Sequence, residues 1–236
     1  MLDNKKVLIF TATYNEAENI ENLINSIKLH ATDSHILVID DNSPDGTSDI
    51  VKKKASLNEN IFLITREGKL GLDTAHKEAY EFAIKNRYDY LITMDADNSH
   101  DPSEIKNFLI ELKDYPFVIG SRYIKDGQCL MRGRRLVMSK YGNLIMKLLL
   151  RINCNEFTTS FRGFNLNQLN NFHLNRIKTK GYSFFMGTIA EINRMNFKIK
   201  EIPIIFADRE KGYSKIPKFE IFRTLMNLII LSIRKK

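Results

Sequence analysis

The 236-residue sequence is poor in the residues that build disulfide frameworks and clustered metal sites. Its two cysteines, Cys129 and Cys154, lie far apart and form no Cys-x-x-Cys pair, and its five histidines are scattered. We therefore expect two free thiols in a reducing compartment rather than a disulfide or a structural zinc site. The first ten residues lack the apolar core and cleavage site of a secretory signal, so we expect a cytoplasmic protein.

The sequence also lacks an apolar stretch long enough to cross a bilayer. The uncharged stretch 225–233 has nine residues, which make about 14 Å of helix against a hydrocarbon core of about 30 Å. What is present is typical of a folded protein: 43% hydrophobic residues, 27% charged residues of both signs and a net charge of +8. This length and composition fit one large or two small domains.

Short apolar runs recur along the first half of the chain and predict strands that are buried on both faces. These runs are residues 7–10, 36–39, 61–64, 90–93 and 117–120. Segments of helical period lie between them, and this alternation predicts an α/β fold with a doubly wound, mostly parallel sheet. The second half is basic at first and then predicts helices over 136–150 and from 183 onward, a strand over 197–206 and a terminal amphipathic helix. We see no linker and expect one domain.

An acidic loop follows the second predicted strand. It reads DDNSPDGT over residues 40–47, in which Ser-Pro-Asp-Gly is a turn. Ligands of parallel sheets bind beyond the carboxyl ends of the strands, so Asp41 is placed to accept hydrogen bonds from a ribose or a base. The alternative is a tight turn alone, with Thr47 as the cap of the next helix.

The fourth predicted strand ends in an Asp-x-Asp pair. Asp95 and Asp97 are two residues apart in an extended segment, so both side chains point the same way and can hold one cation. Carboxylate oxygens favour Mg²⁺ or Mn²⁺, which would bridge the phosphates of a nucleoside diphosphate. Asp-x-Asp is a common pattern, but its position after a buried strand favours such a substrate. The nearby His100 is either a further ligand or, as is commoner for one isolated histidine, a structural residue.

Two other loops carry weaker signals for phosphate and nucleotide binding. Residues 13–16, Thr-Tyr-Asn-Glu, open a helix, where backbone N–H groups and an aromatic ring can meet a nucleotide. A second loop places Arg66 and Lys69 among glycines before another helix, which suits phosphate neutralisation. Because the glycine spacing is not that of a P-loop, the sequence argues against an ATPase.

Taken together and in order, these motifs resemble the dolichyl-phosphate mannosyltransferase-like branch of the family 2 glycosyltransferases. The resemblance runs from residue 7 to about residue 216. The motifs that carry it are TYNE (13–16), DDNSPDGT (40–47), REGKLGL (66–72), MDADNSHDP (94–102), GSRY (120–123), the spacing of Arg135, Ser139 and Asn143, TSFRGF (159–164), GYSF (181–184) and PIIFADREKGYSK (203–215).

The resemblance implies a glycosyltransferase A-type, Rossmann-like fold in a single domain over 1–236, with a donor and metal half over 1–122 and an acceptor half over 123–236. It implies that a divalent cation, Mg²⁺ or Mn²⁺, assists transfer of a hexose, mannose or glucose, from a GDP- or UDP-sugar to a polyprenyl or dolichyl phosphate. The transfer would invert the anomeric carbon.

The resemblance also implies a role for individual residues. Those expected to bind the nucleotide sugar are Thr13, Tyr14, Glu16, Asp41, Asp45, Lys69 and Asp95. Those expected to hold the metal are Asp95 and Asp97. Those expected to bind the acceptor phosphate are Arg122, Arg135, Ser139, Arg162, Arg209 and Lys215. The expected catalytic set is Asp95, Asp97, Arg122 and Arg135.

A phosphate acceptor makes chemical sense of these residues. The second pKa of a lipid monophosphate is about 6, so its oxygens are nucleophilic at neutral pH without a strong general base. Arginine forks can bring such a dianion beside an anionic diphosphate. A single arginine is more often a solvated surface charge, but the set spaced over three motifs favours acceptor binding.

Two alternatives to this activity remain. One is transfer to a saccharide hydroxyl in polysaccharide synthesis, and the other is a catalytically silent relative that binds a nucleotide sugar. Family 2 enzymes that act on hydroxyl groups commonly carry a Glu-Asp pair and a Trp-containing motif. This sequence has no Glu-Asp dipeptide and no Trp, which favours a phosphate acceptor.

The sequence departs from the family pattern at several positions. Ala12 stands where Pro is usual, Ser99 where some members have a metal-binding Gln, and Glu156 where Asp is usual. Residues 184–187, Phe-Phe-Met-Gly, lack both polar side chains of the family's Phe-Gln-x-Glu pattern. The role that relatives give to that glutamate therefore does not carry over to Gly187.

A polyprenyl acceptor lies in a membrane, so we expect the protein to associate peripherally with the inner face of a membrane. The charge of +8 favours anionic lipid. The amphipathic tail has its apolar residues at Phe219, Phe222, Leu225, Met226, Ile229 and Ile230. This tail could lie at the interface or simply cover the sheet, and a membrane-protein partner could serve the same purpose. We expect no nucleic-acid partner.

Overall fold

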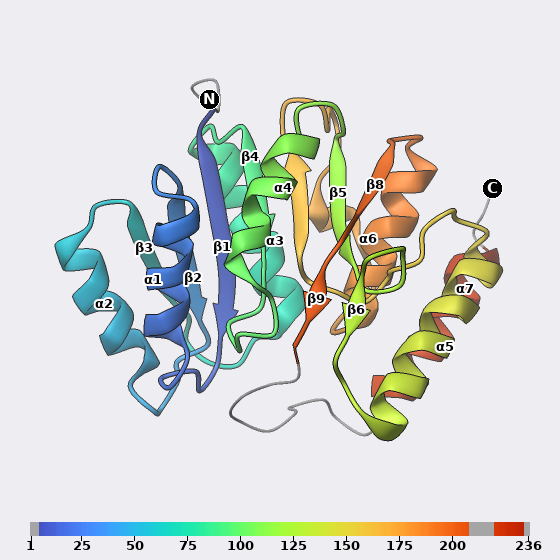
Figure 1. Ribbon diagram of the computed structural model, residues 1–236, viewed down its shortest axis with the longest axis horizontal. Helices are drawn as coiled ribbons and strands as arrows, with labels where there is room; N and C mark the ends of the chain where they lie inside the picture. The colour runs from blue at the N-terminus through green and yellow to red at the C-terminus, as the bar shows by residue number, and fades with distance from the viewer. Residues whose placement is uncertain (1–4, 208–219, 234–236) are drawn as a thin grey trace.

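One seven-stranded sheet runs through the structure (Figure 1). The computed structural model describes residues 5–207 and 220–233. The strand order is β3-β2-β1-β4-β7-β5-β8. The strands are β1 (Val7–Thr13), β2 (His35–Asp40), β3 (Ile61–Thr65), β4 (Tyr90–Thr93), β5 (Phe117–Ser121), β7 (Arg162–Asn165) and β8 (Ile199–Pro203). All five predicted strands are confirmed, as β1 to β5.

Helices cover both faces of the sheet, each over its own hydrophobic core. One core lies beneath α1, α2 and α4, and the other lies beneath α3, α6 and the inner sides of α5 and α7. In Figure 1, α5 and α7 lie side by side at one end of the molecule, beyond β8. The helices are α1 (Ile20–His30), α2 (Thr47–Leu57), α3 (Leu72–Lys85), α4 (Ile105–Glu111), α5 (Gly133–Leu150), α6 (Ser183–Arg194) and α7 (Glu220–Ile233), with short 3₁₀ turns η1 (Pro102–Glu104) and η2 (Leu174–Arg176).

The strand β7 interrupts the parallel order of the sheet. It pairs antiparallel with both β4 and β5, whereas β1 to β4 pair in parallel with one another and β5 pairs in parallel with β8. This strand was not predicted from the sequence, because its four residues, which begin Arg-Gly, show neither an apolar run nor a clear alternation. The sheet is therefore mostly parallel, as predicted, with one unpredicted antiparallel insertion.

The strand predicted over 197–206 is divided in two. It ends as β8 at Pro203, which has no backbone N–H for a further ladder bond. Ile205–Phe206 forms β9, which pairs with β6 (Gln128–Cys129) in a separate two-stranded sheet. Cys129 and Cys154 are free thiols, as predicted, and burial raises the pKa of Cys154. None of the helices in the described ranges combines the length and apolarity that crossing a membrane requires.

Candidate active site

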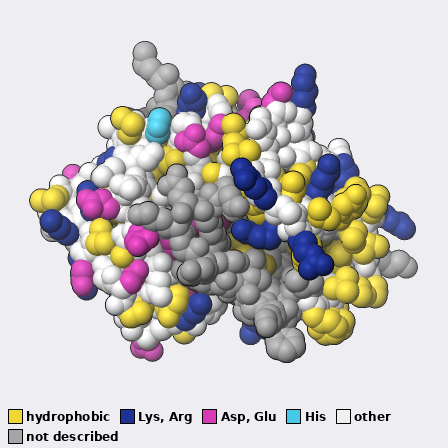
Figure 2. All heavy atoms as spheres, turned by 60° about the horizontal axis from the view of Figure 1, so that its bottom comes forward, with side chains coloured by type: hydrophobic (Ala, Val, Ile, Leu, Met, Phe, Trp, Pro, Cys, Tyr) yellow, Lys and Arg dark blue, Asp and Glu magenta, His cyan; other side chains and the backbone are white. Residues whose placement is uncertain are grey.

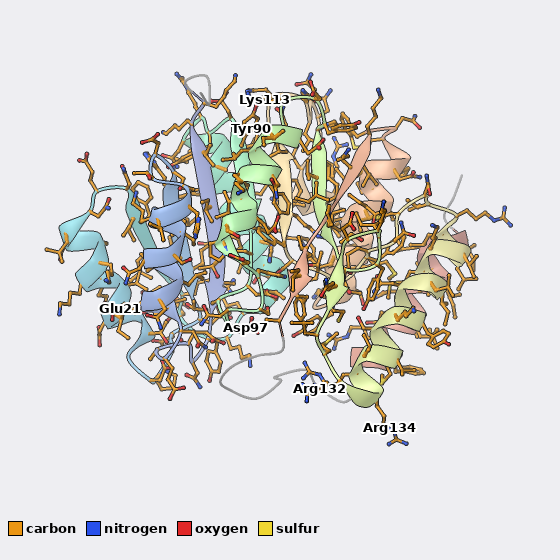
Figure 3. All side chains as sticks on the ribbon, in the orientation of Figure 1. Glu21, Tyr90, Asp97, Lys113, Arg132 and Arg134 are labelled. Atoms are coloured by element: carbon orange, nitrogen blue, oxygen red, sulfur yellow. The ribbon has the colours of Figure 1, made fainter. Side chains whose placement is uncertain are left out.

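The carboxyl ends of β1, β2 and β4 meet at one edge of the sheet, because these strands are adjacent and parallel. Figure 3 shows Asp97 at this edge, whereas Tyr90 at the start of β4 and Lys113 lie at the opposite end. Arg132 and Arg134, at the beginning of α5, lie at the same end of the molecule as Asp97. The fold thus gathers an acidic and a basic group of residues at one end.

Asp40 organises the loop after β2. Its buried carboxylate accepts hydrogen bonds from the hydroxyl groups of Thr13 (2.6 Å), Ser43 (2.6 Å) and Ser48 (2.8 Å) and from the Ser43 N–H (2.8 Å). These bonds satisfy a carboxylate that would be costly to bury without partners. The predicted site residue Thr13 therefore uses its hydroxyl proton inside the protein, and Asp40 has a structural role.

Asp41 is paired with Arg66. The Arg66 Nε–H donates to Asp41 Oδ1, and the same guanidinium donates to Thr74 Oγ1 (2.6 Å) and to the Gly71 carbonyl (3.1 Å). Both charged residues are buried. The assignment of Arg66 to phosphate neutralisation was wrong for this structure, in which Arg66 orients Asp41 and ties its loop to the start of α3. The role of Asp41 in nucleotide binding stays a prediction.

Asp45 joins the loops after β1 and β2. Its carboxylate accepts hydrogen bonds from the Ala17 N–H (3.0 Å), the Thr47 N–H (3.1 Å) and the Thr47 hydroxyl (2.6 Å). Burial alone would raise the pKa of Asp45, but these hydrogen bonds outweigh it and lower the pKa. Thr47 also accepts from the Glu16 N–H at 3.0 Å. Thr47 is the first residue of α2 rather than its cap. The N-cap residue is Gly46, with φ +88°.

A cation–π contact joins the loops after β1 and β3. The Lys69 Nζ lies 4.4 Å from the centre of the Tyr14 ring. Glu16 accepts a hydrogen bond from Asn19 Nδ2 at 2.9 Å, and Asn98, in the loop after β4, donates to Asn19 Oδ1 at 3.4 Å. The structure therefore brings together residues from separate loops that were predicted to bind the nucleotide sugar. Asn19, which the sequence analysis did not single out, connects two of these loops.

Hydrogen bonds from Ser99 and to His100 fix the loop that carries Asp95 and Asp97. Ser99 donates its hydroxyl (2.5 Å) and its N–H (3.2 Å) to Asp97 Oδ1. The Asp95 N–H donates to His100 Nδ1 (3.1 Å), and His100 Nε2 lies 3.2 Å from Thr159 Oγ1. Since Nδ1 accepts, the network assigns the ring proton to Nε2, which donates to Thr159. Burial lowers the pKa of His100 although both aspartates oppose the shift. These contacts favour the structural alternative for His100.

The two aspartates differ in exposure. Asp97 is buried, whereas 35% of the Asp95 side chain is exposed. Two carboxylates directly after β4 offer the hard oxygen ligands that Mg²⁺ or Mn²⁺ prefers. The residues present therefore fit a divalent cation shared with further oxygen ligands from a substrate.

Arg122 follows β5 and is bound to Glu156. Its Nε and Nη2 donate to the two carboxylate oxygens at 2.7 Å each, and Nη2 also donates to Thr158 Oγ1 at 2.7 Å. Burial disfavours both charges, but the pairing holds the pKa of Glu156 below and that of Arg122 above the ordinary values. Glu156 thus occupies one edge of the guanidinium, and the role of Arg122 in binding the acceptor phosphate stays a prediction.

The predicted acceptor residues on α5 are anchored by hydrogen bonds. The Tyr123 hydroxyl donates to Ser139 Oγ (2.7 Å), Asn143 Nδ2 donates to the Ser139 carbonyl (2.8 Å), and Asn143 Oδ1 accepts from the Phe157 N–H (2.7 Å). Arg135 is exposed, one turn before Ser139. Tyr123 was not among the predicted site residues, although its position directly after Arg122 was a signal for it.

Arg162 has a structural role. It is 1% exposed, and its guanidinium donates to the carbonyls of Thr159 (2.8 Å), Phe185 (2.8 Å) and Phe157 (3.1 Å). Burial lowers the pKa of Arg162 to about 9. The prediction that Arg162 binds the acceptor phosphate is corrected, because all three nitrogens serve the backbone inside the protein. Two further predicted residues, at positions 209 and 215, lie outside the described residues.

Gly187 lies where α6 packs closely against the segment before it. A Cβ at this position would come within 2.2 Å of the Thr179 Oγ1 and 3.0 Å of the Ile177 Cγ2. Thr179 is itself buried, and its hydroxyl has no hydrogen-bond partner within the described part of the chain. This close approach accounts for the glycine at this position, because any side chain would displace Thr179.

We expect Gly187→Ala to destabilise the protein by about 1–3 kcal/mol, because the added methyl group overpacks the contact with Thr179. The loss should appear as a lower urea midpoint with an unchanged m-value. In a Thr179→Ala background the same substitution should cost much less, since the clashing oxygen is gone. An equal cost in both backgrounds would contradict this explanation.

Comparisons with known proteins agree with this architecture. The structure is similar to glucosyl-3-phosphoglycerate synthase from Mycobacterium tuberculosis in complex with Mn²⁺, UDP and phosphoglyceric acid, with a TM-score of 0.69, 15% identity and coverage of 98% of this chain and 78% of that one. It is also similar to a mannosyltransferase from Pyrobaculum calidifontis in complex with GDP-Man and Mn²⁺, with a TM-score of 0.62, 18% identity and coverage of 98% and 64%. The fold is therefore the glycosyltransferase A-type fold.

The sequence comparisons are more specific. Residues 8–172 match the model of glycosyl transferase family 2. The chain is 32% identical over 212 residues to an undecaprenyl-phosphate mannosyltransferase from Micrococcus luteus, covering 89% of this chain and 87% of the relative. It is 30% identical over 233 residues to a polyprenol monophosphomannose synthase from Mycolicibacterium smegmatis, covering 98% and 88%. The chain belongs to glycosyl transferase family 2.

Proposed function

We propose that this glycosyltransferase moves a hexose, with mannose as the first candidate, from a GDP- or UDP-sugar to a polyprenyl phosphate at the inner face of a membrane. The observation that carries the proposal is that Asp97, after β4, lies at the same end of the molecule as Arg132 and Arg134, at the beginning of α5 (Figure 3). The names of the two sequence relatives support the sugar and the class of acceptor.

The donor would bind across the loops after β1, β2, β3 and β4. Asp41 and Asp45 are fixed by internal partners and would accept hydrogen bonds from the nucleoside, while Lys69 over the Tyr14 ring would face the diphosphate. Glu16 and Thr13 would hold the loop in shape.

Asp95 and Asp97 would hold a divalent cation, Mg²⁺ or Mn²⁺, together with the diphosphate oxygens. When bound, the cation supplies positive charge to the leaving diphosphate. Ser99 fixes the orientation of the Asp97 carboxylate, and the His100 ring fixes the backbone of Asp95. These two residues therefore preorganise the metal ligands.

The acceptor phosphate would meet the exposed Arg135 and the hydroxyl of Ser139, one turn apart on α5. The helix dipole also favours an anion near the first turn, where Arg135 lies. The Ser139 oxygen accepts from Tyr123, so its own proton can donate to phosphate. A phosphate oxygen would form the new bond to the anomeric carbon opposite the nucleotide. The bond between the anomeric carbon and the diphosphate oxygen would break, and its electron pair would stay with that oxygen. Because the attack comes from the opposite face, the anomeric carbon would be inverted.

We expect Arg135→Ala to raise the KM for polyprenyl phosphate by about tenfold or more, because a charge-assisted contact to the phosphate is lost. The affinity for the nucleotide sugar should not change. Steady-state kinetics and donor titration measure the two effects separately. Arg194→Ala is the matched control, since Arg194 is 61% exposed on α6 and is paired with its helix neighbour Glu191. A loss of donor affinity alone would contradict the assignment.

The proposed activity is tested by incubating the purified protein with Mg²⁺ or Mn²⁺, radiolabelled GDP- and UDP-hexoses, and either polyprenyl phosphate or an oligosaccharide. Label in an acid-labile product that extracts into organic solvent is the expected result. Label in a glycan would instead identify a hydroxyl acceptor. Donor binding without any transfer would identify a catalytically silent relative.

A further inference from the structure

Helix α5 turns its more apolar side away from the protein. Asn143, Met146 and Leu150 face inward and are 2%, 7% and 1% exposed. Seven outward residues of α5 are large and apolar, and each is 45–65% exposed. They are Val137, Met138, Tyr141, Leu144, Ile145, Leu148 and Leu149. A helix that only covered a core would show the reverse pattern.

Helix α7 extends this apolar surface. It packs against α5 and α6, with Leu228 buried at 3% exposure. Its outward residues are 43–76% exposed and are Phe222, Leu225, Met226, Ile229, Ile230 and Ile233. Figure 2 shows apolar side chains gathered over the end of the molecule that α5 and α7 occupy in Figure 1. We call these thirteen residues of α5 and α7 the α5/α7 face; contiguous apolar patches of this kind mark docking surfaces.

The charged residues of α5 are all of one sign. Residues 133–150 contain no Asp or Glu, whereas Arg134, Arg135, Lys140 and Lys147 lie within them and Arg132 directly precedes them. Figure 2 shows Lys and Arg side chains beside the apolar surface. A second copy of this chain, with a net charge of +8, would bring a like-charged surface against this one. An anionic membrane offers acyl chains for the apolar side chains and negatively charged headgroups for the basic residues of α5.

We propose that the α5/α7 face lies on an anionic membrane, with its apolar side chains in the acyl boundary and the arginines at the start of α5 at the level of the lipid phosphates. The orientation rests on the proposed lipid acceptor: Arg135 and Ser139 belong to the same helix, so an acceptor in the bilayer presents its phosphate directly to them. Two helices of this kind would lie in the plane of the interface rather than cross it.

The absence of Trp from the sequence allows a direct test. Leu148→Trp places a single indole on the α5/α7 face, and Leu57→Trp places one on α2, where Leu57 is 79% exposed. Vesicles of phosphatidylcholine with phosphatidylglycerol should shift the emission of the first variant to shorter wavelength and leave the second unchanged. Pure phosphatidylcholine and high salt should weaken the shift. Equal responses of the two variants would overturn the proposal.

A charge-insertion pair provides the second measurement. Leu144→Glu/Leu148→Glu should weaken co-sedimentation with anionic vesicles at least about tenfold, and Leu29→Glu/Leu57→Glu, at positions 75% and 79% exposed on α1 and α2, should not. Circular dichroism verifies that both variants fold. The assay contains neither donor nor acceptor, so its result is independent of the proposed reaction. A wild-type dimer in sedimentation analysis that Leu144→Glu/Leu148→Glu dissociates would overturn the proposal and identify a contact between copies.

Discussion

Asp97→Asn should lower the turnover of the enzyme by about 10³-fold or more while leaving its fold intact. The amide oxygen can still accept the hydrogen bonds that Ser99 donates, so the loop keeps its shape. The lost charge removes half of the carboxylate pair that would hold the cation, and neutralising a leaving diphosphate contributes several kcal/mol to such a reaction. Single-turnover transfer with Mn²⁺ or Mg²⁺ measures the effect.

The same variant should lose the metal dependence of nucleotide binding. Titration of the nucleoside diphosphate with and without Mn²⁺ measures that dependence, which should be large in the wild type and small in Asp97→Asn. Asp49→Asn is the matched control, because Asp49 is 82% exposed on α2. Full turnover by Asp97→Asn would remove the metal assignment, and with it the proposed role of Asp95.

Glu156→Ala should destabilise the protein by about 3–5 kcal/mol, because it leaves the buried Arg122 guanidinium without its counter-charge. The carboxylate also accepts hydrogen bonds from the N–H groups of Thr158 and Thr159, which would lose their partner. Urea denaturation measures the loss. The double variant Arg122→Met/Glu156→Gln should recover most of it, since no unpaired charge remains. Glu156→Ala with wild-type stability would contradict the role of the pair.

The Arg122–Glu156 pair also makes the free energy of unfolding depend on pH. The pKa of Glu156 is lower in the folded chain than in the unfolded chain, where it is about 4.3. Its contribution to stability is therefore complete above that pKa and disappears as the pH falls through the folded-state value. The free energy of unfolding of the wild type should fall more steeply on acidification than that of Arg122→Met/Glu156→Gln.

Much of this architecture could be predicted from the sequence, because the strands β1 to β5 are apolar runs bounded by turn residues. Parallel strands place their following loops at one edge, so the position of Asp41 and Asp97 at the same edge of the sheet also followed from the pattern. The strand β7 could not be predicted in this way, since its pairing depends on partners about 45 and 70 residues away in sequence.

The roles of individual charged residues were harder to predict. Arg66, Arg122 and Arg162 look alike in the sequence, yet each is buried and bound to an internal acceptor, whereas Arg135 is exposed. The buried arginines differ from Arg135 because the fold buries them and brings a carboxylate or carbonyl acceptor close to each, such as Glu156 to Arg122. A motif identifies the arginine but not its partner.

The insertion of β7 between β4 and β5 sets the order in which the chain can assemble. During synthesis from the N-terminus, β4 is complete at Thr93, but its neighbour on that side is not finished until Asn165. Until then the edge of β4 exposes unpaired N–H and C=O groups to other nascent chains. A fragment that stops at residue 122 would therefore keep an open strand edge at β4, which favours aggregation.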